Sequence, residues 1–459
     1  MKQPGRRRRP PWWTVAIAVA FVYLVLGIWA IYLREFTIRR NAGWVDSERR
    51  KLRLVHHPEP HPNAFDTYAE AVDLLKRSGV ASELVNDWSV AVIMSDAATA
   101  DALEAGAREA LRAAGPAVER MRQAAGQEYL SRPDAARPQA YAWLYPDRKA
   151  ARVAAAEAIR HHGDSDDAGA LREVEDVLAL GVALSRGSEQ QQTRCGAGII
   201  GLGGQCGRFV LAHTTAPAME LRLHAGRMRA LRARMTPLSE TVAATWAVLM
   251  AEMAKVAPAV TLERAAQTPR NPEAESMSKV GRVRVWATTN SSFDESMQWI
   301  EDRFARLAEA ADAPFGDTSW DELVARICPD ARSRRDYWAG IAAGALDRQL
   351  HSDWLRAQGD LIAEEAIACI QAYRIEHGEY PESLHALLPD YMPELPVDPW
   401  TGETMVYRRT DEGFTLYAVG ANGVDDGGVC DPRDAARVDQ VFVPMPPVAP
   451  ERGSTESSP

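Results

Sequence analysis

A charge-free stretch near the start of the chain limits most strongly how this protein can fold. No Asp, Glu, Lys or Arg occurs from Pro10 to Leu33, directly after a basic block at Arg6 to Arg9. About 20 apolar residues suffice for a helix to cross the hydrocarbon layer of a membrane. A cleavable signal peptide would have a shorter apolar core, of about 7–15 residues, and a small-x-small cleavage site, which is poorly matched here. We therefore expect an uncleaved transmembrane helix over residues 12–33, after a basic cytoplasmic segment at residues 1–11.

The basic residues around this span indicate its orientation. Lys2 and the four arginines at Arg6 to Arg9 precede it, whereas only Arg34, Arg39 and Arg40 follow closely. The more basic flank usually stays in the cytoplasm, so we expect a single-pass protein of the inner (cytoplasmic) membrane with its N-terminus inside. The bulk of the chain would then be periplasmic or otherwise extracytoplasmic. The formal net charge of −10 argues against a nucleic-acid partner, which would require a basic face.

Helical periodicity dominates the chain after a proline-containing linker at residues 34–62. Leu171, Val174, Leu178 and Val182 repeat on one helical face, and similar patterns recur elsewhere in residues 63–350. Gly115-Pro116 and the segment at residues 161–167 have the composition of loops. We expect a large α-helical domain here, built from helical hairpins in a solenoid-like arrangement.

One motif in this region imitates a nucleotide-binding fingerprint. Gly196, Gly198 and Gly201 spell GxGxxG, but that fingerprint requires a preceding strand, and the sequence predicts an amphipathic helix there. The glycines between Gly196 and Gly207 are better explained by two helices that approach closely. Cys195 and Cys206 lie in the same region, either as a disulfide in an oxidising compartment or as buried free thiols.

Known catalytic motifs are not recognisable in the sequence. There is no GxSxG or HExxH pattern, and the 10 histidines form no placed dyad. We therefore expect a protein that is not an enzyme, while an unrecognised enzyme in the helical domain remains an alternative.

The C-terminal region, residues 351–443, has a different pattern. A helix is expected over residues 353–377, with Gly378 as its left-handed cap. A short helix over residues 382–388 and a proline-rich segment follow, and then two strands near residues 405–409 and 414–419. A loop rich in Gly and Asp comes next, and the tail at residues 444–459 has the composition of a disordered segment. The whole chain is thus expected to be mainly α, with a small α+β module at its C-terminal end.

This module resembles the C-terminal domain of the major pseudopilin of type II secretion systems, protein G of the general secretion pathway. The resemblance is carried by YP after the long helix, by LPxDPWxG, and by LYAVGANG ahead of the acidic loop. The matching positions are Tyr380, Pro381, Leu395, Pro396, Asp398, Pro399, Trp400, Gly402, Gly420 and Gly423. With NAFDTYAEA at Asn63 to Ala71 and its long helical middle, the whole chain also resembles large membrane-anchored proteins of planctomycete-like bacteria. The N-terminal apolar run differs from a pilin leader, because it lacks the glycine and the glutamate of the processing site.

The pseudopilin resemblance implies a calcium ion in the last loop, and hard oxygen ligands of the kind that calcium prefers are present there. The candidate ligands are Asn422, Asp425, Asp426, Asp431 and Asp434.

Together these features predict a non-enzymatic, membrane-anchored envelope protein. Its pseudopilin-like head would be presented for interaction with envelope or secretion-related proteins. The alternative is a helical scaffold or binding protein in which the head serves only as a structural cap.

Overall fold

The described part of the chain is mainly helical and contains one small sheet, as the sequence predicts. The computed structural model describes residues 21, 24, 61–128, 141–186, 190–245, 293–311, 348–411, 413–429 and 439–443. Nearly all of the expected anchor at residues 12–33 and all of the tail at residues 444–459 lie outside these ranges. Among the described residues, one helix is long and apolar enough to cross a membrane, Gln192–His213, and most of it is buried within the fold.

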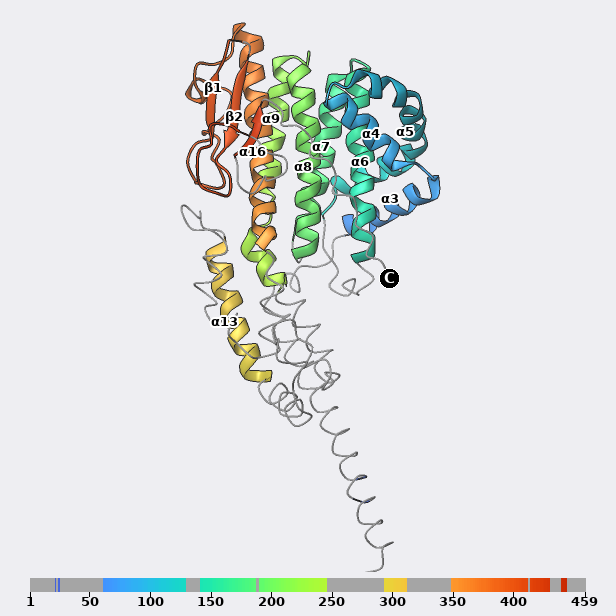
Figure 1. Cartoon of the computed structure of the whole chain (residues 1–459), viewed down its shortest axis with the longest axis vertical. Coiled ribbons are helices and arrows are strands. Elements are labelled where there is room, and N and C mark those ends of the chain that lie inside the picture. Colours follow the sequence, from blue (N-terminus) through green and yellow to red (C-terminus); the bar gives the residue numbers. More distant parts are fainter. Residues whose placement is uncertain are drawn as a thin grey trace, which may run out of the picture.

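Seven helices follow one another between residues 64 and 233 in the described part of the chain (Figure 1). They are α3 (Ala64–Ser78), α4 (Ser82–Ile93), α5 (Ala97–Ala125), α6 (Tyr141–Gly163), α7 (Asp167–Ser185), α8 (Gln190–His213) and α9 (Ala218–Ala233). Short polar side chains start three of them by accepting hydrogen bonds from backbone N–H groups that lack a partner within the helix. These caps are Asn63, Asp96 and Asp166.

The apolar periodicity seen in the sequence corresponds to the buried faces of these helices. All four members of the pattern in α7, from Leu171 to Val182, are buried. A further helix, α13 (Phe293–Ala311), buries Phe304 and Leu307, which are three positions apart and lie on one helical face. The helical interpretation of these segments is confirmed.

The expected loop at Gly115-Pro116 is wrong, because Pro116 lies inside α5. Proline removes one backbone donor and usually breaks a helix. Here the helix has buried side chains on both sides of the proline, including Leu111, Ala114 and Val118. Tertiary packing of this apolar face therefore overrides the local preference.

The C-terminal module begins with α16 (Arg348–His377), five residues earlier than expected. Gly378 ends it with φ +81°, as predicted for a left-handed cap. The expected short helix at 382–388 is a 3-10 turn, η4 (Leu384–Leu387). The predicted strands are confirmed as β1 (Val406–Arg409) and β2 (Phe414–Ala418), which pair in antiparallel register.

A third strand, β3 (Gln440–Val443), pairs antiparallel with the other side of β2 and was not predicted. Figure 1 shows α16 between this sheet and helices α8 and α9. Buried residues of α16, such as Leu361 and Ile367, belong to one hydrophobic core that also contains residues of α7, α8 and the sheet. The head and the helical body are therefore packed as one unit through α16.

Candidate functional site

Asp398 organises the turn that carries the Leu-Pro-x-Asp-Pro-Trp motif. It is buried, and its carboxylate accepts hydrogen bonds from the backbone N–H groups of Trp400 and Val419, each at 2.7 Å. Burial raises the pKa of Asp398, against the opposing effect of these N–H donors. The carbonyl of Asp398 also accepts from the backbone N–H of Gly402 at 2.9 Å. Asp398 thus joins the proline-rich turn to the end of β2.

Other matched residues also form contacts inside the head. The hydroxyl of Tyr407 donates to the Pro381 carbonyl at 2.7 Å, and the ring of Tyr380 lies 5.2 Å from that of Phe414. The indole N–H of Trp400 donates to Gln440, whose side-chain amide donates to the Arg356 carbonyl of α16. The backbone N–H of Met405 donates to the Pro396 carbonyl, and that of Gly423 to the Gly420 carbonyl. Within the described residues the motif holds the head together.

Three of the five candidate calcium ligands lie in the described part of the last loop. Asp425 accepts from the Tyr417 hydroxyl at 2.8 Å and from the Gly427 N–H at 2.9 Å, and these hydrogen bonds lower its pKa. The Asn422 amide donates to Asp426 at 2.8 Å. Asp431 and Asp434 lie outside the described residues. Among the described residues, no three His, Cys, Asp or Glu side chains gather as a metal site would require.

A series of ion pairs joins the acidic side of α16 to α8 and α9. Arg194 pairs with Asp353 at 3.0 Å, and the buried pair of Arg208 and Asp360 is 2.8 Å apart. Arg229 pairs with Glu365 at 2.8 Å. Sequence reasoning missed this interface, although Asp353, Asp360 and Glu364 recur at positions i, i+7 and i+11, which place three carboxylates on one helical face.

His224 of α9 lies at the centre of this interface, between two carboxylates. It is 1% exposed, with Nδ1 2.9 Å from Glu175 of α7 and Nε2 3.3 Å from Glu364 of α16. Burial alone would lower the pKa of His224, but the hydrogen bonds and charges of Glu175 and Glu364 outweigh it and raise that pKa to about 9. His224 is therefore a cation at neutral pH, linking α7, α9 and α16.

The glycines of the GxGxxG stretch lie on α8, and α7 precedes them instead of a strand. A Cβ on Gly196 would lie within 3.0 Å of Gly181 and Ser185 of α7, and one on Gly207 within 3.0 Å of the Glu364 carboxylate. These glycines allow α7 and α16 to approach α8 closely. The helix-packing interpretation is confirmed at these positions.

The two cysteines of α8 are free and buried, as is Cys369 of α16. Cys195 and Cys206 are 11 positions apart on one helix, which separates their Cα atoms by roughly 16 Å at the rise of an α-helix. A disulfide needs Cα atoms within about 7 Å. Of the two alternatives, a disulfide or buried free thiols, the structure therefore supports buried free thiols for both residues.

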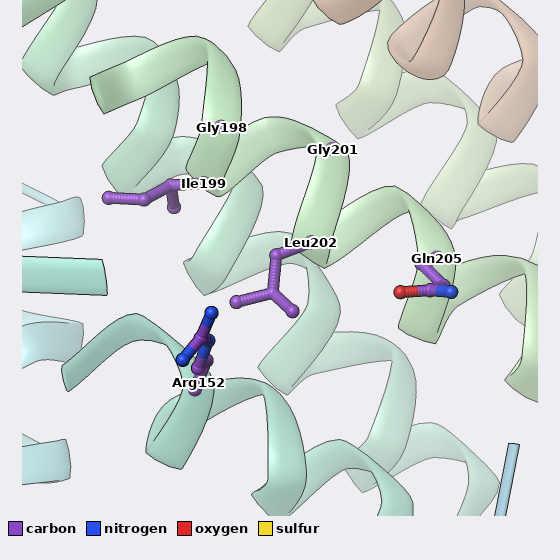
Figure 2. Close-up of a pocket in the computed structure, with 6 residues that line it drawn as sticks. All are labelled: Arg152, Gly198, Ile199, Gly201, Leu202 and Gln205. Atoms are coloured by element: carbon purple, nitrogen blue, oxygen red, sulfur yellow. The ribbon is translucent and has the colours of Figure 1, made fainter. Parts of the chain in front are cut away.

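A hollow of about 230 Å³ lies between α6 and α8. Figure 2 shows its lining: Arg152 comes from α6, and the other residues follow one another along α8. The α8 residues are Gly198, Ile199, Gly201, Leu202 and Gln205. This lining contains no carboxylate, thiol or imidazole, so the hollow carries no acid, base or nucleophile among its described residues.

Among the described residues, buried ion pairs therefore join the helices, and the motif residues hold the turns of the head. Comparison with known proteins adds no assignment, since no family model, no curated protein and no solved structure matches this chain.

Proposed function

We propose that this is a non-enzymatic, membrane-anchored envelope protein whose helical body presents a pseudopilin-like head to an envelope or secretion-related protein. The observation that supports this proposal best is the position of α16. One side of it packs on α8 and α9 through ion pairs, and β2 and β3 of the head contact it as well. A head attached in this way has a defined orientation on its support.

The last loop of the head offers the surface for such a partner. Val424 and Val429 are 56% and 57% exposed there, beside the carboxylates of Asp425 and Asp426. Exposed apolar residues next to charges are typical of protein-binding surfaces. A partner with an apolar patch and basic residues around it would complement this loop.

A second candidate function is a helical scaffold that uses the head as a cap. This alternative is favoured by the motif contacts, since Asp398, Trp400 and Tyr407 all bond within the chain. In that case the partner would bind the helical body, and the last loop would be dispensable.

Photo-crosslinking in cells distinguishes the two functions. A photoreactive amino acid placed at Val424 or Val429 of the full chain should give adducts with a membrane or envelope protein. Met94, which is also exposed but lies at the end of α4, is the matched position on the body. Adducts at Met94 alone would favour the scaffold, and their absence at all three positions would contradict both proposals.

We also propose, from the pseudopilin resemblance, that the last loop binds calcium. The described residues fit this in part, because Asn422 and Asp426 lie together but Asp425 is engaged by Tyr417 and Gly427. Calcium should raise the melting temperature of the full chain, since a ligand that binds only the folded state stabilises it. The double substitution Asp425→Asn and Asp426→Asn should remove that effect. An equal calcium response in both proteins, or none in either, would contradict the proposal.

A further inference from the structure

The outward face of α9 carries an apolar stripe with coiled-coil spacing. Its residues alternate at intervals of four and three, and all are exposed: Met219, Leu223, Gly226, Ala230 and Ala233. Met219 is 67% and Leu223 45% exposed, and exposed apolar side chains that lie together in a patch are more informative than single ones. A Cβ built on Gly226 would meet no other atom within 4 Å. The stripe is therefore open surface.

The opposite face of α9 is already occupied by the protein's own core. Leu221, Met228 and Leu231 are buried, and His224 is held between α7 and α16. The helix is thus fixed on its inner side and apolar on its outer side. Intervals of four and three on a single face are the pattern by which two helices interlock along a seam.

We propose that this stripe is a homodimer interface, in which α9 of one copy packs antiparallel against α9 of a second copy. The argument for a second copy is the distribution of side-chain size along the stripe. Large residues occupy its first half and small residues its second half. A twofold axis near Gly226 sets Met219 of each copy opposite Ala233 of the other, and Leu223 opposite Ala230. Each large side chain then meets a small one, as close packing requires.

Charges at the two ends of the stripe favour the same arrangement, and Arg227, beside its middle, is paired with Glu175 of its own chain at 2.8 Å. Glu220 lies at the start of α9 and the exposed Arg234 directly follows its end. Antiparallel pairing brings Glu220 of each copy close to Arg234 of the other. Parallel pairing would instead set Glu220 beside Glu220, Met219 on Met219 and Gly226 on Gly226, which combines like charges with an uneven fit.

The size of the stripe indicates a weak dimer. A stable interface buries about 800 Å² on each partner, and a seam of four helical turns offers less than that. The seam is formed by α9 alone, so it does not rest on the proposed function of the head.

Cysteine crosslinking of the full chain in detergent tests the geometry. Cys328→Ser and Cys430→Ser provide the background, and the buried Cys195, Cys206 and Cys369 remain. We expect Gly226→Cys to crosslink to itself through a short bifunctional maleimide. A mixture of Met219→Cys and Ala233→Cys chains should give mixed dimers, several-fold more than Met219→Cys alone. Preferential self-crosslinking of Met219→Cys would overturn the antiparallel seam.

Ala230→Glu tests the interface itself, with Ala113→Glu on α5 as the matched control, since both alanines are exposed on helices. Light scattering over a concentration series should show dimers for the parent chain and for Ala113→Glu. Ala230→Glu should weaken the dimer at least tenfold, with an unchanged melting temperature. A parent chain that is monomeric at every concentration, or an Ala230→Glu chain that dimerises like the control, would overturn the proposal. Either result is independent of which partner the head binds.

Discussion

His224 shows how a single buried side chain can connect three helices. Its ring lies between Glu175 of α7 and Glu364 of α16, and Glu364 is 0% exposed. Arg227 also binds Glu175, through contacts of 2.8 and 2.9 Å. A buried carboxylate is costly without a compensating charge. The protonated imidazole therefore supplies a charge that the packing of α16 requires.

His224 makes the stability of the protein depend on pH in a defined direction. Its pKa is about 9 in the folded state, above the ordinary value of 6.5. The stabilisation is therefore complete below about pH 6.5 and is lost as the pH rises through about 9. From the size of the shift, it amounts to roughly 3 kcal/mol at most. Urea unfolding at several pH values should show this decline in the parent chain and a flatter curve for His224→Gln.

The difference between the two pH curves is the informative quantity, because other titrating groups are common to both proteins. Asp176, whose pKa burial and the nearby Glu173 raise to about 6, titrates in both. Parallel curves between pH 6 and pH 9 would contradict the assigned role of His224.

Helix α8 is the central packing element, and its glycines determine how closely its neighbours approach. Gly196 contacts α7 at the backbone level, and Gly207 faces the Glu364 carboxylate of α16. Its length and apolar composition would also suit a membrane span. Burial by surrounding helices explains the same composition without a membrane.

Substituting the two kinds of glycine in α8 should give opposite results. Gly196→Ala places a methyl group 2.5 Å from the Gly181 carbonyl oxygen and 2.9 Å from the Ser185 amide nitrogen of α7, so we expect a loss of about 3 kcal/mol from overpacking. Gly201→Ala meets only an ordinary contact, at 3.5 Å from Asp360, so we expect a gain of about 0.5–1 kcal/mol from helix propensity. Chemical denaturation measures both. Equal effects of the two substitutions would show that close approach to α7 is not what Gly196 provides.

The molecule as a whole has a core that runs from α3 to the sheet. Because α16 packs on α8 and α9 of the body and on β2 and β3 of the head, neither the helical body nor the head is complete without it. In this arrangement the head is packed against the body, unlike a head on a flexible stalk.

The shared helix predicts that the head and the body unfold together. In hydrogen exchange at increasing denaturant, amides of β2 and of α8 should become exposed in the same opening reaction. Asp398→Asn, a change confined to the head, should lower the protection of both elements. Exchange of β2 at denaturant concentrations that leave α8 fully protected would show instead that the head is an independent unit.

Local patterns in the sequence were sufficient for several elements of this protein. The periodicity of residues 171–182 predicts α7, Gly378 marks the end of α16, and the aromatic run at residues 414–419 predicts β2. These signals are short-range, since helix faces, caps and strand alternation depend on neighbours a few positions away. The expected membrane span is also a local pattern, and it remains a prediction.

Only the tertiary structure decided which contacts the charged and small residues of those elements make. His224 and Glu364 are 140 positions apart in sequence, Arg208 and Asp360 are 152 apart, and no spacing rule connects either pair. The structure likewise brought β3 to the sheet and kept Pro116 inside α5. The physical reason is that burial is a collective property: a carboxylate on α16 is part of a solvated face or of a core ion pair according to what packs against it. The charge-free span from Pro10 to Leu33 predicts that the protein is anchored in a membrane, whereas the packing of α16 decides how the head is attached to the body.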